Sequence, residues 1–167
     1  MYISEFMSKY YISIDQGTTS SRAVLYDSSF KQITQEQQEF TQHYPAEGSV
    51  EHDPEEIWNS VFKTVISLMS KNGINSSEVI SIGITNQRET VMLWDKEGKV
   101  LNKAIEWQDR RTADFCEELK GRGVEPEVTE KTGLLLDPYF SATKARWLLK
   151  KHKIDPNKYF FGTIDTF

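Results

Sequence analysis

The sequence opens with a succession of three short β-prone runs separated by two polar turns, and this feature constrains the fold most. Tyr10–Ile14 and Arg22–Tyr26 flank a first turn, and Ile33–Phe40 can return as a third strand after a second turn at Asp27–Ser29. Aromatic and β-branched residues bounded by Gly, Ser and Asp are typical of strands joined by tight turns. We therefore predict two successive β-hairpins.

A capped helix is predicted next, after a loop at residues 41–52. Asp53 suits the N-cap, Pro54 suits the first helical position, and Glu56 completes a capping pattern. Asn72 and Gly73 supply a stop signal. The apolar positions at helical spacing, all interpreted as core, are Ile57, Trp58, Val61, Phe62, Val65, Leu68 and Met69.

The rest of the chain alternates between strand and helix patterns. The expected elements, in chain order, are a buried strand Val79–Ile84, a strand Thr90–Trp94, a turn at residues 95–99, a helix Arg111–Lys120, one or two helical turns at Pro126–Lys131, a helix capped by Ser141 with Ala145, Leu148 and Leu149 inward, and a strand Tyr159–Ile164. Strands first and then strands alternating with helices indicate an α/β fold with a mixed β-sheet and flanking helices.

Composition excludes several classes of protein. A length of 167 residues with 38% hydrophobic residues is enough for one domain with a core, and the net charge of −5 argues against a nucleic-acid binder. The lone Cys116 excludes an internal disulfide and is interpreted as a buried apolar residue. Without a leader pattern or an apolar run of membrane-spanning length, we expect a cytoplasmic protein with no membrane insertion. Residues 1–8 are expected to be a flexible extension, and residues 9–167 the folded domain.

The turn between the first two predicted strands carries the most chemical information. Asp15 stands at a strand end, Gly17 lets a ligand approach the backbone, and hydroxyl residues lead to Arg22. Backbone N–H groups and hydroxyls in a tight turn suit phosphate oxygens. Arg22 can neutralise a phosphoryl group, and Asp15 can hold Mg²⁺ directly or through water. The alternative is an ordinary polar hairpin turn.

Two further segments suit a small polyol. Arg88 and Glu89 directly follow the predicted strand Val79–Ile84, and an adjacent Arg–Glu pair offers both donors and acceptors. Trp107 stands among polar residues just before a helix, and Tyr139 stands in a rigid turn before another helix; both can pack against a carbon skeleton, and Tyr139 also offers its hydroxyl. The alternatives are a surface ion pair and two core aromatics. The three histidines lack metal-ligand spacing, so no zinc site is expected.

Six segments together resemble the glycerol kinases, members of the FGGY family of carbohydrate kinases, in the expected order and over essentially the whole chain from Lys9. They are Asp15–Arg22 (DQGTTSSR), Val50–Pro54 (VEHDP), Gly83–Thr90 (GITNQRET), Trp107–Thr112 (WQDRRT), Lys131–Ser141 (KTGLLLDPYFS) and Phe161–Thr166 (FGTIDT). The resemblance implies an actin-like, ribonuclease H-like ATPase fold, of which this chain would be the first lobe only, and incomplete. It also implies ATP-dependent conversion of glycerol to sn-glycerol 3-phosphate, and a homo-oligomeric full-length enzyme.

The resemblance assigns roles to the residues that match its motifs. Thr18, Thr19, Ser20 and Arg22 would bind the nucleotide phosphates, and Asp15 would organise Mg²⁺. The implied glycerol ligands are Thr18, Arg88, Glu89, Trp107 and Tyr139.

This sequence departs from the pattern at two positions, since Ser49 replaces a usual Trp and Glu106 a usual apolar residue. No residue here receives the role of general base, which in the family lies beyond the position of Phe167, so the isolated chain is expected to be inactive. Two alternatives stay open: a related kinase for a pentose or another polyol, and a non-catalytic binding fragment.

Overall fold

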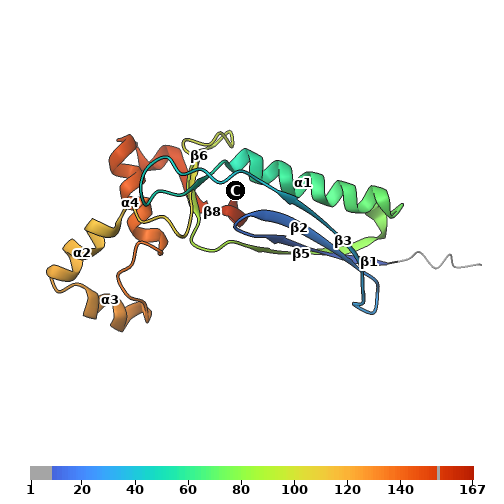
Figure 1. Cartoon of the computed structure of the whole chain (residues 1–167), viewed down its shortest axis with the longest axis horizontal. Helices are drawn as coiled ribbons and strands as arrows, with labels where there is room; N and C mark the ends of the chain where they lie inside the picture. Colours follow the sequence, from blue (N-terminus) through green and yellow to red (C-terminus); the bar gives the residue numbers. More distant parts are fainter. Residues whose placement is uncertain (1–8, 154) are drawn as a thin grey trace, which may run out of the picture. The chain divides into compact units, whose positions relative to one another are not determined.

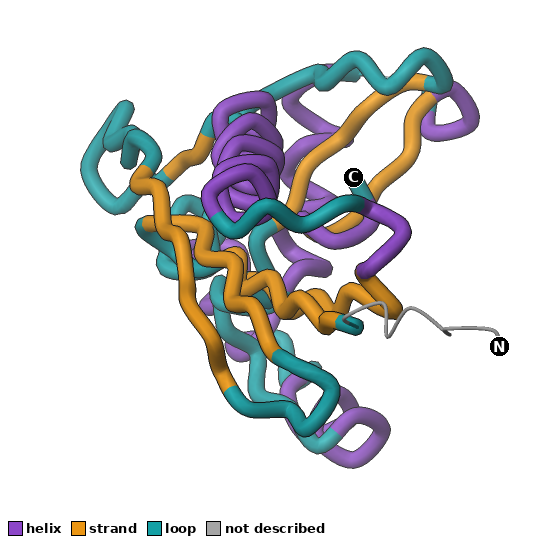
Figure 2. The backbone as a smooth tube through the Cα atoms, turned by 90° about the vertical axis from the view of Figure 1, so that its right-hand side faces the viewer, coloured by secondary structure: helices purple, strands orange, loops and turns teal. Residues whose placement is uncertain are grey.

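The computed structural model describes residues 9–153 and 155–167, so the prediction of a flexible extension at residues 1–8 lies outside the described residues. The described residues form eight strands, four α-helices and three short 3-10 helices, coloured by type in Figure 2. They divide into two compact units. Unit 1 comprises the residues up to 41 together with residues 55–86, and unit 2 comprises residues 42–54 and 87–167. Each unit contains one four-stranded sheet.

Unit 1 contains the two predicted hairpins. Strands β1 (Tyr10–Gln16), β2 (Ser20–Tyr26) and β3 (Gln32–Glu39) pair in antiparallel succession, and β5 (Val79–Asn86) pairs parallel to β1. Helix α1 (Pro54–Lys71) precedes β5 in the chain and runs alongside the strands in Figure 1. The short helix η1 (Ser76–Glu78) leads into β5. The predicted mixed sheet is therefore confirmed in this unit.

The core of unit 1 lies between α1 and the sheet. Ile12, Ile14 and Leu25 are buried there with Leu68, and three partly buried residues of α1 pack against them: Val61, Val65 and Met69. Burial of this apolar surface is the main force that holds the helix to the sheet.

Two predictions about burial in unit 1 are wrong. Ile82 and Ile84 are 47% and 65% exposed, because β5 is an edge strand of the sheet whose outer side is uncovered in the described structure. Trp58 and Phe62, predicted as core, are 56% and 54% exposed. They follow the buried Ile57 by one and five positions, which places them ~100–140° around the helix from it, beside the core face and not on it. Their rings stack on each other with centroids 6.3 Å apart.

Unit 2 holds an entirely antiparallel sheet in the order β4-β7-β6-β8, made of Glu51–His52, Ala104–Ile105, Val91–Asp95 and Tyr159–Thr163. Its helices are α2 (Ala113–Gly121), α3 (Glu125–Thr132) and α4 (Ser141–His152), followed by η2 (Pro156–Lys158) and η3 (Ile164–Thr166). Val91, Leu93 and Ile105 of the sheet share a buried cluster with Leu148 of α4. Cys116 is buried in α2, as predicted.

Three predictions in unit 2 need correction. The predicted loop 41–52 ends in the short strand β4, which pairs with β7. Leu149, expected inward, is 38% exposed, because the buried face of α4 passes through Leu148. Ser141 is the first residue of α4 and not its N-cap, a position that Phe140 occupies without a side-chain hydrogen bond. The cap comes instead from Glu89, whose Oε2 accepts hydrogen bonds from the backbone N–H and the hydroxyl of Ser141.

Candidate active site

The turn between β1 and β2, together with the start of β2, holds the predicted phosphate-binding residues at one end of the two central strands of the sheet of unit 1. The N–H of Gly17 donates to the carbonyl of Ser20 at 2.9 Å and closes the turn. A Cβ on Gly17 would lie 3.3 Å from that carbonyl, so the tight turn favours glycine. Thr19 is exposed at the tip, and the Ser20 hydroxyl accepts a hydrogen bond from Gln37 of β3 at 2.8 Å.

Asp15 and Arg22 face each other across the hairpin. They are register partners in the β1–β2 ladder, and the guanidinium donates to Asp15 Oδ2 at 2.6 Å. Both side chains are more than 40% exposed, so solvent screens this pair and leaves it able to rearrange. The structure therefore brings together the residue predicted to organise Mg²⁺ and the residue predicted to bind phosphate.

The predicted polyol ligands Glu89, Trp107 and Tyr139 belong to unit 2. The rings of Trp107 and Tyr139 meet edge to face, with centroids 5.8 Å apart, although they come from segments 32 positions apart in the sequence. Both rings are half-buried, so each keeps a surface that solvent or a ligand reaches. Asp137 fixes the turn before α4. Its Oδ1 accepts hydrogen bonds from the backbone N–H of Tyr139 at 2.8 Å and from Arg110 Nη1 at 3.0 Å.

Glu89 has an unusual backbone conformation. Its φ of 61° lies in the left-handed region, which a residue with a side chain occupies only when its surroundings impose it. The preceding residue, Arg88, is exposed, and no ion pair joins it to Glu89 within the described structure. The surface ion pair considered as an alternative is therefore absent, because Glu89 bonds to Ser141 of α4 instead.

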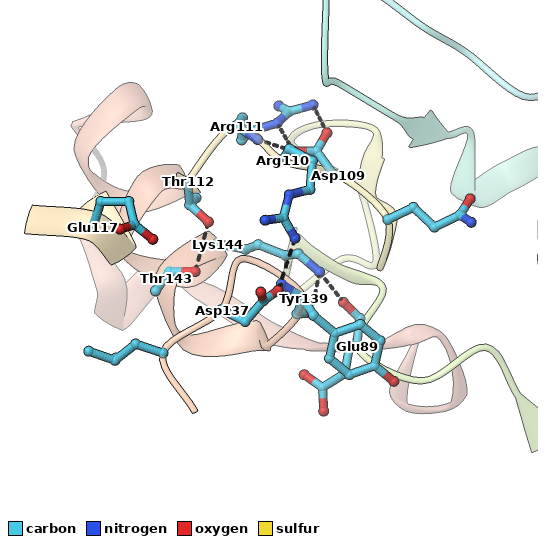
Figure 3. Close-up of polar contacts among 12 residues, drawn as sticks. Glu89, Asp109, Arg110, Arg111, Thr112, Glu117, Asp137, Tyr139, Thr143 and Lys144 are labelled. Atoms are coloured by element: carbon cyan, nitrogen blue, oxygen red, sulfur yellow. Dashed lines mark hydrogen bonds and ion pairs between the residues drawn. The ribbon is translucent and has the colours of Figure 1, made fainter. Parts of the chain in front are cut away.

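Three buried charged residues support this cluster: Glu106, Lys144 and Asp109. Only Glu106 among them stood out in the sequence, as a departure from the family pattern. Glu106 is fully buried beside Trp107 in the chain, and burial raises its pKa to about 7. Lys144 is also fully buried, and burial lowers its pKa to about 8. Lys144 stands four positions before the buried Leu148, so helical spacing already placed it on the inner face of α4. Figure 3 shows its ammonium group directed toward Glu89 and Tyr139.

Asp109 is the second buried carboxylate, and it organises the segment before α2. Its Oδ2 accepts the backbone N–H of Val50 at 2.7 Å, and its two oxygens accept the backbone N–H and the guanidinium of Arg111 at 2.8–2.9 Å. Arg111 also reaches Glu51 at 2.8 Å and lies over the ring of Trp147. An Arg whose side chain is only 8% exposed, held by two carboxylates and an aromatic face, makes a rigid support for the residues around Trp107.

A chain of buried polar side chains runs behind Trp107. The backbone N–H of Trp107 donates to the Thr90 hydroxyl at 3.2 Å, and that hydroxyl donates to Gln87 Oε1 at 2.9 Å. Gln87 Nε2 contacts His52 Nδ1 at 3.2 Å. His52 Nε2 contacts Gln42 Oε1 at 2.6 Å. Each donor meets an acceptor if His52 is neutral with its proton on Nε2. This network fixes the backbone at Trp107, and the sequence offered no pattern that would predict it.

Comparison with known proteins establishes the family. The model of the N-terminal domain of the FGGY family of carbohydrate kinases matches residues 10–166, and the chain belongs to this family. A glycerol kinase from Brucella ovis is 54% identical over 166 residues, which cover 96% of this chain and 33% of that protein. The chain therefore spans about a third of the length of the curated relatives it matches.

Solved structures agree with this assignment. A Plasmodium falciparum glycerol kinase with ADP superposes with a TM-score of 0.85 at 34% identity, over 95% of this chain and 33% of that one. A ligand-bound xylulose kinase from Lactobacillus acidophilus has the same TM-score at 25% identity, over 93% of this chain and 31% of that one. The predicted actin-like ATPase fold is confirmed, and the family is one of nucleotide-binding kinases.

Among residues 9–153 and 155–167, no helix combines the length and the apolar character needed to cross a bilayer. The same residues contain no group of three or more His, Cys, Asp or Glu side chains arranged to hold a metal ion.

Proposed function

We propose that this chain forms part of an ATP:glycerol phosphotransferase that produces sn-glycerol 3-phosphate and ADP. The observation that carries the proposal is the cluster of Glu89, Trp107 and Tyr139, which combines a carboxylate with two aromatic rings at 5.8 Å, in a chain 54% identical to a named glycerol kinase. A three-carbon triol needs one apolar surface for its carbons and several polar groups for its hydroxyls. This cluster offers both.

In this proposal, each residue of unit 2 has a distinct task. The rings of Trp107 and Tyr139 contact the carbon chain, and the phenol also offers its hydroxyl. Glu89 accepts hydrogen bonds from the glycerol hydroxyls, since a carboxylate has further lone pairs after its bonds to Ser141. The exposed Arg88 donates to the same hydroxyls.

We assign the nucleotide phosphates to the turn of unit 1. Thr18, Thr19 and Ser20 supply hydroxyls and backbone N–H groups, and Arg22 supplies positive charge. Thr18 also contacts glycerol. Mg²⁺ bound with ATP neutralises phosphate charge, and such an ion commonly takes only one or two protein carboxylates. The single exposed carboxylate of Asp15 fits that requirement, provided that Arg22 moves from Asp15 to phosphate.

The reaction itself is an in-line transfer. A glycerol oxygen forms a bond to the γ-phosphorus while the bond from that phosphorus to the bridging oxygen breaks, and ADP leaves with the electron pair. The hydroxyl proton must pass to a base. We assign no base among residues 9–167 and infer that it belongs to the two thirds of the relatives' length that this chain does not cover. We also propose cytoplasmic location and homo-oligomerisation for the full-length enzyme.

A related sugar kinase is the second candidate, because the xylulose kinase superposes as well as the glycerol kinase does. The higher identity to glycerol kinases favours glycerol. A pentose would also need more polar contacts than the three residues of the cluster provide.

The test measures ADP release with Mg²⁺-ATP by the full-length natural protein that contains this sequence, with glycerol or xylulose. We expect glycerol-dependent turnover that Glu89→Gln reduces by about 100-fold, since it removes a charged acceptor. Glu97→Gln, in an exposed turn of the same unit, is the control and should leave the rate unchanged. The 167-residue chain alone should show no turnover. Faster turnover of xylulose, or none with either substrate, would refute the proposal.

A further inference from the structure

Lys144 of α4 joins two of the proposed substrate-binding segments through its ammonium group. Nζ donates to the backbone carbonyl of Glu89 at 2.7 Å and to the backbone carbonyl of Tyr139 at 2.8 Å. These carbonyls belong to residues 50 positions apart in the chain. Figure 3 shows the two contacts converging on the ammonium group. The Lys144 side chain is fully buried.

Burial of the Lys144 ammonium group is unfavourable for the free energy of folding. A buried ammonium loses its hydration, and here burial lowers its pKa to about 8. The charges that act on it are the carboxylates of Asp109, Glu89 and Glu106 and the guanidinium of Arg111. Glu106 is itself fully buried, and its Oε1 lacks a hydrogen-bond partner in the described structure. A methionine would fill the same volume without these costs, so packing alone does not explain a lysine here.

The conformation of Glu89 explains why a lysine stands at position 144. Its left-handed backbone is unfavourable for a residue with a side chain and needs external support. The first turn of α4 provides that support at two points. Ser141 binds the Glu89 carboxylate through its N–H and hydroxyl, and Lys144, three positions further along the same helix, binds the Glu89 carbonyl. The carboxylate is thereby held at a fixed place relative to Tyr139.

We propose that Lys144 is a positioning residue for the cluster of Glu89, Trp107 and Tyr139. It holds Glu89 and Tyr139 in the arrangement that binds substrate and does not touch the substrate itself. This inference rests on the proposed glycerol kinase function. It assigns to the residue an effect on glycerol affinity and not on ATP affinity, because its contacts are confined to the polyol cluster and its supports.

The experiment determines kcat and KM for glycerol and for ATP in the full-length natural protein and in Lys144→Met. Since a misplaced carboxylate weakens substrate contacts, the KM for glycerol should rise about 10-fold or more, with the KM for ATP within about twofold of the unchanged protein. Lys150→Met, an exposed lysine of the same helix, is the matched control and should change neither constant.

If Lys144 only stabilised the fold, Lys144→Met would change kcat and not the KM for glycerol. Loss of folded protein lowers the apparent kcat but leaves the KM for glycerol unchanged, because KM does not depend on the active fraction. An unchanged KM for glycerol in Lys144→Met would therefore overturn the inference. If that variant does not fold, Lys144→Gln retains two N–H donors without the charge and should show a smaller rise of the same kind; an unchanged KM there has the same meaning. Absence of glycerol turnover in the unchanged protein would instead refute the proposed function.

Discussion

The proposed phosphate-binding turn of unit 1 (Asp15–Arg22, the phosphate turn) and the proposed polyol-binding cluster of unit 2 (Glu89, Trp107 and Tyr139, the polyol cluster) are built in opposite ways. The turn uses local backbone geometry, hydroxyls and one exposed ion pair, all within eight consecutive residues from Asp15 to Arg22. The cluster collects side chains from three distant segments and rests on charges that are fully buried, Lys144 and Glu106 among them. A site that binds a charged phosphate can remain open to solvent. A site that orients a small neutral polyol needs rigid walls, and here these depend on buried polar contacts.

The strongest test of this contrast removes a buried carboxylate from unit 2. Asp109→Ala should lower the free energy of unfolding by about 3–5 kcal/mol, because it leaves the buried Arg111 with one carboxylate partner fewer and the Val50 N–H unpaired. Urea unfolding measures the difference. Asp114→Ala, an exposed carboxylate in α2, should change the same quantity by less than about 0.5 kcal/mol. Equal losses of unfolding free energy in the two variants would show that the buried carboxylate does not support the cluster of unit 2.

The second test uses the pH dependence of stability. Burial raises the pKa of Glu106 from 4.5 to about 7, so the folded state binds this proton more tightly than the unfolded state does. Stability contributed by the protonated group is present below pH 4.5 and is lost as the pH rises to about 7, by up to ~3 kcal/mol. Glu106→Gln should remove this dependence. Parallel profiles of unfolding free energy against pH for the two proteins would show that Glu106 does not titrate in this range.

The third test concerns apolar surface on the sheet of unit 2. Phe160 and Phe161 of β8 are 51% and 44% exposed, and we expect such surface to promote self-association of the chain. Phe161→Ser should weaken association by about 1 kcal/mol, or roughly fivefold in the dissociation constant. Sedimentation over a dilution series measures it, with the exposed Phe30→Ser of unit 1 as control. A monomer at every concentration would refute the expectation.

The smallest effect on stability should come from the phosphate turn. Arg22→Ala breaks an ion pair whose members are both more than 40% exposed, so the free energy of unfolding should fall by less than about 1 kcal/mol. The KM for ATP in the full-length protein should nevertheless rise about 10-fold or more, because a phosphate ligand is lost. A large loss of stability with unchanged KM for ATP would reverse the assignment of this residue.

The sequence by itself determined the local elements and the phosphate turn. Three features depend on residues close together in the chain: the two hairpins, the start of α1 at Pro54, and the proximity of Asp15 and Arg22 across the first turn. Turn residues, helix caps and side-chain periodicity act over a few positions, so such features can be predicted from order alone. The resemblance of six motifs also identified the family that the comparisons then established.

The tertiary structure alone decided burial and the construction of the polyol cluster. Ile84 belongs to a strand that looks like a core strand, yet the edge position of β5 leaves it exposed. Ser141 has the character of a helix cap, yet Glu89, 52 positions earlier, supplies the cap. Helical spacing puts Lys144 on the inner face of α4, but only the structure shows that its ammonium group binds the carbonyls of Glu89 and Tyr139. Burial and long-range hydrogen bonds depend on which segments meet in space, and the periodicity of one segment carries no information about its neighbours.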